Sequence, residues 1–409
     1  MSSFIETSYG DRLKAAYDAE VKRQSETVEL IASENFVSDD VLKALGSCFT
    51  NKYSEGYPAI RHDGVGRKGR YYGGCEFIDN VEELCCELWQ QVFDTDYHVN
   101  VQPHSGSQAN FAAYMAVMEP FKDEILSMSL DNGGHLSHGS PVNFSGKMYK
   151  VSSYSVDENG LIDYGSIGSQ IKMCHPKVVL AGASAYSRII DFKLIRQIID
   201  ECSTDEYRPY FMVDMSHIAG LVAAGCHQSP FGYADIVTTT THKTLRGPRG
   251  GLIFCKPELA DKIDSAVFPG TQGGPLQNVI LAKAVCALEA LRPEYDKYIH
   301  RVVWNASAMA NEFINMGYKV VSDGTDNHLF LLDFSTTHPN LTGKQVQDYL
   351  DTKGITVNKN CVPKETRSPF QTSGIRIGTP AMTTKGWGIT EFISCAHVID
   401  GYLKELNAL

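Results

Sequence analysis

Short apolar runs alternate with amphipathic stretches along most of the chain. Between about residue 34 and residue 290, the apolar runs predict strands, and apolar positions spaced three and four apart predict helices. Strands that alternate with helices indicate a mostly parallel sheet with helices on both faces. The predicted strands are Tyr97–Gln102, Lys177–Ala181, Tyr210–Val213, Asp235–Thr238 and Gly251–Phe254. The predicted helices are Phe77–Phe93, Gln108–Met118, Phe192–Glu201, Pro257–Ala266 and Leu276–Leu291.

The two ends of the chain differ from this central region. Residues 8–27 have the pattern of an amphipathic helix. After residue 290, further helices accompany predicted strands at Tyr318–Val321, Leu329–Asp333, Ile355–Asn358 and Gly374–Ile377. We predict a helical arm at 1–27, a large α/β domain at 28–290 and a smaller C-terminal α+β domain at 291–409. Because no repeat or low-complexity linker separates them, the domains should pack firmly.

Composition narrows the class of protein. Of the 409 residues, 43% are hydrophobic and 21% are charged, which is typical of a soluble globular chain. The formal net charge of −11 argues against a nucleic-acid or membrane-surface partner. No apolar run approaches the roughly 18 residues of a membrane span, and the N-terminal composition is not that of a signal or transit peptide. We therefore expect a cytoplasmic protein.

Eleven cysteines are scattered through the chain, mostly in apolar segments. They form no CxxC motif and no Cys/His cluster with zinc spacing. We expect free thiols in a reducing compartment, without a disulfide or a bound metal.

One lysine stands among hydroxyl side chains directly after a predicted strand. Lys243 follows the run Thr238–Thr241 and precedes a glycine-rich turn that ends at Gly251. A buried lysine near other cations has a lowered pKa and reacts with aldehydes to form a Schiff base. Nearby hydroxyl and N–H groups suit a phosphate. The stretch therefore indicates pyridoxal 5'-phosphate (PLP) bound covalently to Lys243, although a solvated loop with a surface lysine would show the same local pattern.

An acid ends another predicted strand about thirty residues earlier. Asp214 follows Tyr210–Val213, and ligands of α/β sheets bind at the C-terminal ends of strands. A PLP site needs a carboxylate beside the pyridine nitrogen, because the protonated ring is the electron sink. His217 could then hydrogen-bond the phenolic oxygen. The alternative is an aspartate that caps the next helix, followed by a packed core histidine.

Three further stretches fit a cofactor and an amino-acid substrate. Ser105, Gly106 and Ser107 open a predicted helix, where backbone N–H groups attract an anion; a plain serine-capped helix start is the alternative. His135 lies in a glycine-rich loop with a second histidine and could stack on a cofactor ring. Arg376, in an apolar strand, could bind a substrate carboxylate bidentately or form an internal salt bridge.

These pieces occur together in one family. From about Glu29 to Tyr402, the chain closely resembles the serine hydroxymethyltransferases, also called glycine hydroxymethyltransferases. The segments that carry the resemblance occur in order along the chain: Glu29–Asn35, Asn51–Pro58, Arg70–Gly74, Gln102–Asn110, Gly133–Gly146, Thr238–Gly251, Gln272–Pro275 and Thr325–Leu329.

The resemblance implies both a fold and an activity. The fold is PLP fold type I, which is similar to aspartate aminotransferase: a mostly parallel mixed sheet between helices, plus a smaller C-terminal α+β domain. The activity is that of a transferase in one-carbon metabolism and amino-acid biosynthesis. It reversibly converts L-serine and tetrahydrofolate, the co-substrate, to glycine and 5,10-methylenetetrahydrofolate. The resemblance further implies a homodimer or a dimer of dimers with shared active sites.

The resemblance assigns cofactor-binding roles to the residues of this chain that stand at matching positions. The resemblance implies that Lys243 holds PLP, that Asp214 pairs with the ring nitrogen and that His135 stacks on the ring. His217 and Ser184 would contact the phenolic oxygen. The phosphate would be bound by Ser105, Gly106 and Ser107, with Gly273, Gly274 and Tyr53 reaching in from the partner subunit.

Substrate roles transfer in the same way. Arg376 and Ser33 would bind the substrate carboxylate, with Tyr72 nearby. Glu55 would be the acid or base at the substrate hydroxyl and the folate. The predicted catalytic residues are Lys243, Glu55, His135, Tyr72 and Asp214, and the positions that match folate contacts are Leu130, Leu136 and Asn360.

The chain departs from the family pattern in one long segment. Ala59–Gly69 is inserted between Glu55 and Tyr72, where relatives have only a few residues. The insert could be a neutral surface loop, could grip a folate polyglutamate tail, or could block folate. In the last case the protein would be a folate-independent PLP aldolase or transaldolase acting on threonine-like β-hydroxy amino acids. Smaller departures are Asn278, where histidine is frequent, and Ser216, where alanine is usual.

A protein of another class also fits the pattern, namely a catalytically silent homologue used for binding. The presence of Lys243, Asp214 and Arg376 argues against it.

Overall fold

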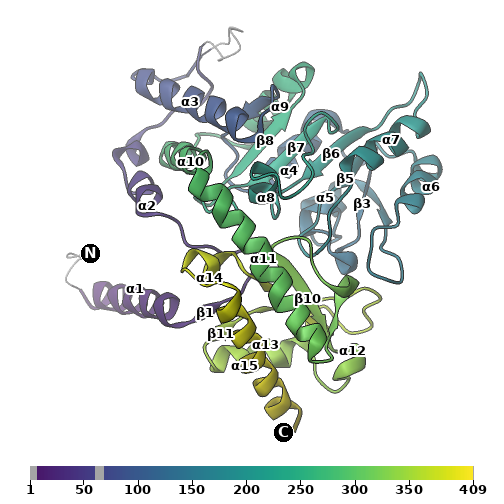
Figure 1. The fold of residues 1–409 in the computed structure, drawn as a ribbon. Helices are drawn as coiled ribbons and strands as arrows, with labels where there is room; N and C mark the ends of the chain where they lie inside the picture. Colours follow the sequence, from purple (N-terminus) through teal and green to yellow (C-terminus); the bar gives the residue numbers. More distant parts are fainter. Residues whose placement is uncertain (1–6, 60–68, 409) are drawn as a thin grey trace.

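A seven-stranded mixed sheet is formed by strands between residues 98 and 255 (Figure 1). The computed structural model describes residues 7–59 and 69–408, so residues 60–68 of the predicted insert lie outside the described residues. Five neighbouring strands of the sheet are parallel, and β8 runs antiparallel to both β7 and β2. The predicted α/β fold class is therefore confirmed. In spatial order the strands are β2 (His98–Asn100), β8 (Gly251–Cys255), β7 (Ile236–Thr240), β6 (Tyr210–Asp214), β5 (Val178–Ala181), β3 (Glu124–Met128) and β4 (Lys150–Tyr154).

Helices cover both faces of this sheet because successive side chains of a strand point to opposite sides. Along β5, Val179 and Ala181 pack into one hydrophobic core, whereas Val178 and Leu180 pack into another. The buried, apolar character of the central strands is what the sequence pattern predicted. The helices of the first core are α3 (Glu76–Phe93), α6 (Tyr164–Cys174), α7 (Phe192–Cys202), α8 (Ala219–Ala223), α10 (Gln277–Ala290) and α11 (Pro293–Asn315), and those of the second are α4 (Gly106–Val117) and α9 (Ala260–Ser265).

Several elements differ from the sequence expectation. The strands β3 and β4 were not predicted; β4 lies at the edge of the sheet, and most of its residues face solvent. The predicted helix Pro257–Ala266 is broken into a 3-10 turn η4 (Pro257–Leu259), α9 and the π-helical turn η5 (Ala266–Thr271). The predicted strand Ile355–Asn358 splits into β11 (Ile355–Thr356) and β12 (Asn358–Asn360).

The C-terminal part has its own antiparallel sheet and core. The sheet has the order β12, β13 (Gly374–Gly378), β10 (Leu329–Asp333) and β9 (Lys319–Val320). The strand β1 (Val28–Glu29) pairs in parallel with β11, so the chain just after the N-terminal helix α1 (Ser8–Glu26) contacts the C-terminal part. The boundaries at residues 27 and 290 stay a prediction. Helices that pack in this core are α11, α13 (Gly343–Thr352) and α15 (Ile389–Ala408).

Short helices complete the described chain. They are α2 (Asp39–Leu45), η1 (Cys48–Asn51), η2 (Leu130–Asn132), η3 (Leu136–His138), α5 (Phe144–Met148), η6 (Val321–Asp323), α12 (Phe334–Thr337) and α14 (Pro380–Thr384).

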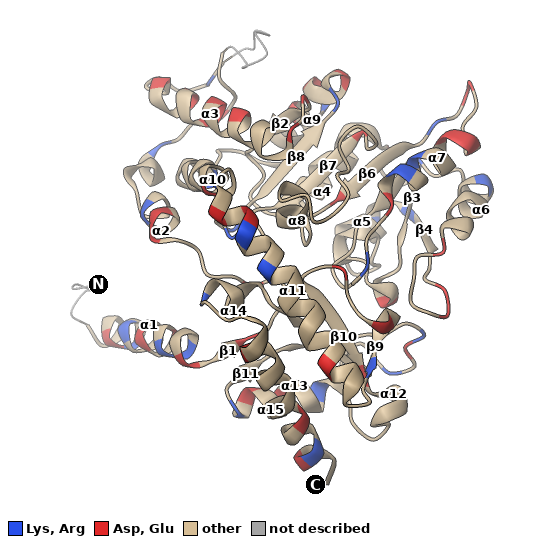
Figure 2. Cartoon of the chain, in the orientation of Figure 1, with Lys and Arg blue, Asp and Glu red and all other residues tan. Residues whose placement is uncertain are grey.

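Charged residues occur mainly on the outer helices and loops, and α1 carries both signs (Figure 2). Among the described helices, none is both long enough and apolar enough to cross a membrane. All eleven cysteines belong to the described residues and are unpaired there.

Candidate functional site

Lys243 lies in the turn that follows β7, at the C-terminal edge of the parallel strands. Its Nζ donates a 2.9 Å hydrogen bond to Oγ1 of Thr240. Burial, together with the charges of Arg376 and Arg249, lowers the pKa of this ammonium group to about 8, although Asp214 opposes the shift. Near pH 7 about a tenth of the amine is therefore uncharged, far more than for a lysine with the ordinary pKa of 10.5.

Asp214 ends β6 on the same edge and is surrounded by hydrogen-bond donors. Oδ1 accepts from the backbone N–H of Ser216 at 3.0 Å and from its hydroxyl at 2.5 Å. Oδ2 accepts from Nδ2 of Asn110 and from Nε2 of His138, each at 2.9 Å. Burial opposes ionisation, but these donors and the neighbouring histidines outweigh it and hold the pKa of Asp214 well below its usual range. These donors therefore keep the carboxylate ionised.

Three of these donors were missed by sequence reasoning. His138 was noted only as a second histidine in the loop of His135, and Ser216 only as a departure from the family pattern. Asn110 gave no local signal, because its contact with Asp214 joins residues 104 positions apart. The hydroxyl of Thr238 donates to Oδ1 of Asn110, which turns the amide nitrogen toward Asp214.

Lys243 and Asp214 line one cavity of about 150 Å³. Its wall includes the predicted residues Ser105, Gly106, Ser107, His135 and Ser184 as well as Lys243 and Asp214, together with Ser216, Thr240, His242 and Arg249.

The start of α4 forms one side of this cavity. Ser105 is the N-cap and accepts from the N–H of Gln108 at 3.3 Å, as in the alternative of a serine-capped helix start. In the described part of the chain, the N–H groups of Gly106 and Ser107 have no backbone partner. A Cβ on Gly106 would lie 2.6 Å from Cγ2 of Thr240, so only glycine lets α4 approach β7 this closely. The helix start therefore presents free donors to the cavity.

A buried lysine fixes the segment that leads into this helix. Nζ of Lys283, on α10, donates to the carbonyl oxygens of Val101, Pro103 and Gly251 at 2.6, 3.0 and 2.8 Å. Three carbonyl acceptors satisfy the three N–H bonds of a buried ammonium group. Lys283 thus joins β2 and β8 just before Ser105.

His135 presents a neutral imidazole to the cavity. Burial, and then the charges of His138 and Lys243, lower its pKa to about 4. The backbone N–H of Ser137 donates to Nδ1 at 3.1 Å, so the ring hydrogen is on Nε2. A neutral, half-buried ring of this kind is suited to stacking on an aromatic ligand.

Arg376 lies beside the cavity, in the central part of β13. Its Nε donates to Oδ1 of Asn358 at 3.1 Å, and Nη1 donates to the carbonyl oxygen of Ser184 at 2.5 Å. No carboxylate pairs with it in the described part of the chain, which argues against the internal salt bridge. Burial lowers the pKa of the guanidinium group to about 10. A buried cation without a protein anion favours an anionic ligand.

Glu55 and its neighbours form a second cluster that does not line the Lys243 cavity. The hydroxyl of Tyr53 donates to Oε1 of Glu55 at 3.2 Å, and the rings of Tyr53 and Tyr72 have their centroids 4.9 Å apart. Gly273 packs against Glu55, and Gly274 packs against the ring of Tyr53. Tyr53 is 55% exposed and Tyr72 42% exposed. The five predicted residues of this group therefore share one exposed patch.

Contacts between residues 54–56 and 70–71 hold the two ends of the insert together beside this cluster; we call these contacts the closed base of the insert. Gly56 pairs with Arg70 in an antiparallel bridge, and the N–H of Tyr71 donates to the carbonyl oxygen of Glu55 at 3.0 Å. The side chain of Arg70 donates to the carbonyl oxygens of Ser54 and Gly56. It also pairs with two carboxylates, those of Asp79 at 2.8 Å and Glu82 at 2.7 Å. The two ends of the insert thus lie side by side, while Glu55 and Tyr72 remain neighbours.

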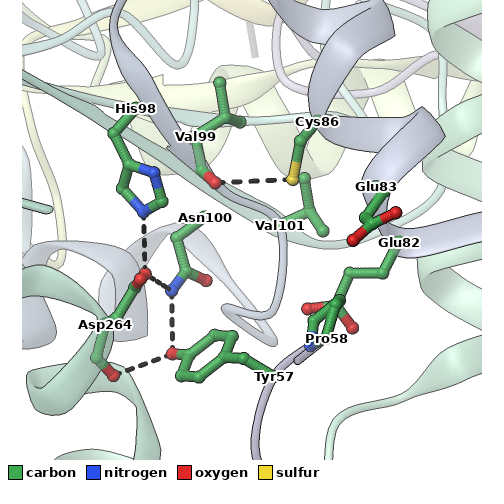
Figure 3. A pocket seen from close by; sticks show the side chains of 10 residues that line it. All are labelled: Tyr57, Pro58, Glu82, Glu83, Cys86, His98, Val99, Asn100, Val101 and Asp264. Carbon is green, nitrogen blue, oxygen red and sulfur yellow. Dashed lines mark hydrogen bonds and ion pairs between the residues drawn. The ribbon is translucent and has the colours of Figure 1, made fainter. Parts of the chain in front are cut away.

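A buried polar network holds Tyr57, two residues before the insert. Oδ1 of Asp264 accepts from His98 and Asn100, each at 2.8 Å (Figure 3). The hydroxyl of Tyr57 donates to the carbonyl oxygen of Asp264 at 2.7 Å and accepts from Asn100. These residues border a separate cavity of about 20 Å³, away from Lys243. The network fixes Tyr57 and so supports the base of the insert.

The remaining predicted residues lie at the margins of this region. Ser33 lines a neighbouring cavity of about 370 Å³, which shares His242 and Arg249 with the Lys243 cavity. Leu130 and Leu136 are half-exposed first residues of η2 and η3, and Asn360 ends β12. His217 is buried after β6 and bonds to His328, a residue to which the sequence assigned no role.

The described residues provide no candidate metal site. Within the described ranges, no group of three or more His, Cys, Asp or Glu side chains is arranged to hold a metal ion.

Comparison with known protein families matches residues 7–399 of the chain to the family of serine hydroxymethyltransferases.

Proposed function

Because the chain belongs to the serine hydroxymethyltransferase family, we propose that the cavity of Lys243 and Asp214 binds PLP and the amino-acid substrate. The enzyme is a PLP-dependent transferase of serine, glycine and one-carbon metabolism, with tetrahydrofolate as co-substrate. It interconverts L-serine and tetrahydrofolate with glycine and 5,10-methylenetetrahydrofolate. Nothing in the family match or in the described structure favours the folate-independent aldolase.

The residues around the cavity fit PLP. A phosphate suits the free N–H groups at the start of α4, next to the hydroxyls of Ser105 and Ser107. An aldehyde suits the amine of Lys243, and a protonated pyridine nitrogen suits the carboxylate of Asp214.

PLP, when bound, accepts the electron pair that is released as the Cα–Cβ bond of serine breaks. Asp214 supports this role because its four donors keep it ionised, so that a positive charge nearby is stabilised. Lys243 supplies the amine that holds the cofactor and can accept or return a proton at Nζ. The neutral ring of His135 lines the cavity, where it suits stacking on the cofactor ring.

We assign the substrate carboxylate to Arg376, with Ser33 as its second contact. The observation that carries the assignment is a buried guanidinium group without an acidic partner among the described residues. An anion held there is fixed beside Ser184, on the wall of the cavity. Fixing one end of serine orients its other bonds, and orientation lowers the barrier.

The cluster of Glu55, Tyr53 and Tyr72 is assigned to the cavity of a partner subunit. Proteins of this family usually act as oligomers. The cluster is exposed on its own chain and does not line the Lys243 cavity of the same chain. Gly273 and Gly274 accompany it, so a partner would receive the whole group together. Glu55 would then exchange a proton with the substrate hydroxyl.

We place the enzyme in the cytoplasm. Its eleven cysteines are unpaired in the described chain, and six of them are buried, as expected for structural thiols in a reducing compartment.

The test is an absorbance titration of the purified enzyme with glycine, before and after tetrahydrofolate is added. A new long-wavelength band that requires both ligands supports the folate-dependent reaction, and Lys243→Ala should show none. A glycine-dependent change that tetrahydrofolate leaves unaltered, together with cleavage of threonine, would contradict it and favour the aldolase.

A further inference from the structure

Two histidines from different parts of the chain share a buried hydrogen bond. His217 follows β6 in the large domain, and His328 directly precedes β10 in the C-terminal part. Nδ1 of His217 lies 3.1 Å from Nε2 of His328, and the two rings stack with their centroids 5.4 Å apart. His217 is 4% exposed and His328 is fully buried. One hydrogen atom must therefore occupy the contact between the two nitrogens.

Both rings are neutral. Burial lowers the pKa of His328 to about 3, and the charges of Arg376 and Lys243 act in the same direction. Burial also holds the pKa of His217 well below its usual range, again with help from Lys243 and Arg376. Each imidazole thus carries a single hydrogen, on either Nδ1 or Nε2.

The surroundings of His328 decide which of its two ring nitrogens carries the hydrogen. Nδ1 of His328 is buried and has no hydrogen-bond partner in the described chain. A hydrogen there would be an orphaned buried donor, which native proteins avoid more strictly than an unused acceptor. The hydrogen of His328 therefore belongs on Nε2, where it is donated to Nδ1 of His217. His217 must then carry its own hydrogen on Nε2.

Nε2 of His217, the ring nitrogen that does not contact His328, belongs to the candidate site. Nε2 of His217 has no partner among the described residues, whereas Nδ1 is occupied by His328. Lys243, Arg376 and His135 are the site residues whose charges act on this imidazole. Ser216, its neighbour in the chain, lines the Lys243 cavity. A hydrogen on Nε2 is thus a donor toward the site.

We propose that His328 is a positioning residue: it donates from Nε2 to Nδ1 of His217 and thereby makes Nε2 of His217 a hydrogen-bond donor to the cofactor's phenolic oxygen. The assignment of the phenolic oxygen rests on the proposed function. The tautomers of the two histidines do not depend on that function: they rest on the geometry of the contact and on the neutrality of both rings.

This relay links the two sheets of the protein at the site. His328 leads into β10, and Leu331 on β10 is the register partner of Arg376 on β13. The carbonyl oxygen of His328 also accepts from the N–H of Thr379, just after β13. The same strand pair therefore positions the proposed substrate clamp and the group that sets the tautomer of His217.

Neutron diffraction from deuterium-exchanged crystals of the holoenzyme tests the tautomers directly. We expect deuterium on Nε2 of His328 and on Nε2 of His217, with none on Nδ1 of either ring. Deuterium on Nδ1 of His328 would overturn the inference. The deuterium positions do not depend on catalysis, so this measurement separates the relay from the proposed function. An enzyme without folate-dependent activity could still show the two tautomers. An enzyme with that activity could equally lack them.

Two variants test the consequence for the cofactor. His328→Leu removes the donor, whereas His328→Gln retains an N–H group, and His300→Leu on the exposed side of α11 is the control. We expect His328→Leu to move the pH midpoint of the cofactor's visible absorbance upward by about one unit or more. In His328→Gln, the midpoint should return most of the way to the value of the unaltered enzyme. Equal midpoints in all three variants would refute the positioning role. If His328→Leu does not fold, the deuterium positions in the unaltered enzyme still decide the question.

Discussion

Nη1 of Arg376 lies 2.5 Å from the carbonyl oxygen of Ser184, so the central strand pair of the C-terminal part contacts the loop that follows β5. Ser184 lines the Lys243 cavity. The position of the guanidinium group relative to Lys243 is therefore set by how the two sheets pack against each other. Binding of a carboxylate at Arg376 would depend on this packing as well as on charge.

Replacing Arg376 should weaken substrate binding without removing the cofactor. Arg376→Lys keeps a positive charge but loses the planar fork, and Arg376→Ala loses both. We expect glycine to bind at least about 30-fold more weakly to Arg376→Ala, equivalent to roughly 2 kcal/mol, with Arg376→Lys intermediate. Spectroscopic titration with glycine measures this, and the exposed Arg208→Ala serves as control. Unchanged glycine affinity in Arg376→Ala would show that the carboxylate binds elsewhere.

The lowered pKa of Lys243 predicts how cofactor attachment depends on pH. Only the uncharged amine reacts with an aldehyde, so the rate of PLP attachment to the cofactor-free protein should rise with pH. The rise should level off above the pKa of Lys243, which is about 8, rather than above its ordinary value of 10.5. Stopped-flow absorbance gives the midpoint, and Lys243→Ala should show no covalent attachment. A midpoint near 10.5 would mean that the amine is not desolvated in the cofactor-free state.

Removing the hydroxyl of Ser216 should destabilise the cofactor-free protein in a pH-dependent way. The hydroxyl donates to the ionised Asp214, and loss of a hydrogen bond to a charged group costs about 1.5–3 kcal/mol. The folded-state pKa of Asp214 is depressed, so its ionisation stabilises the fold above the ordinary value of 3.8, and this stability is lost as pH falls. The three remaining donors keep Asp214 ionised in the folded variant as well, so the destabilisation by Ser216→Ala should be full at pH 7 and shrink only as pH falls well below 3.8, through the folded-state pKa.

Urea denaturation at several pH values measures this difference. Ser169→Ala is the matched control, because its hydroxyl lies on the exposed side of α6 and bonds only to a carbonyl of its own helix. A destabilisation at pH 7 no larger than that of Ser169→Ala would contradict a hydrogen bond from Ser216 to the ionised carboxylate.

Shortening the insert should leave the reaction intact. The base of the insert is closed by the Gly56–Arg70 bridge and by the side chain of Arg70. We expect deletion of residues 60–68 to change kcat and the KM for tetrahydrofolate by less than about five-fold, or roughly 1 kcal/mol. Steady-state kinetics measure both constants.

Arg70→Ala provides the contrast, because it opens the base and leaves Glu82 as a buried charge without its cation. Breaking such a pair costs about 3–5 kcal/mol, so this variant should lose stability and activity together. If the deletion instead abolished the tetrahydrofolate dependence while glycine binding persisted, the insert would be part of the folate site.

The elements that carry the chemistry were predicted because their signals are local. Asp214 and Lys243 each follow a buried apolar strand, and parallel strands end at one edge of a sheet. That edge is where the structure brings the two residues into one cavity. The predicted helix start at Ser105 depends likewise on a few consecutive small residues.

The donors around Asp214 and the pair of His217 with His328 could not be predicted in this way. Each contact joins residues on separate elements, and its partner is set by packing rather than by neighbours in the chain. The edge strand β4 was missed for a related reason. Because solvent covers most of its residues, it lacks the apolar run that marks a buried strand.

The closed base at Arg70 also bears on how proteins of this kind diverge. Two fixed points a few ångströms apart allow the chain between them to gain or lose residues in evolution, since each doubling of a flexible loop costs only about 0.6 kcal/mol. Selection acting on Glu55 and Tyr72 would not detect such changes in length. The position between them is therefore a place where a new recognition element or an engineered tag can be added beside a working catalytic group.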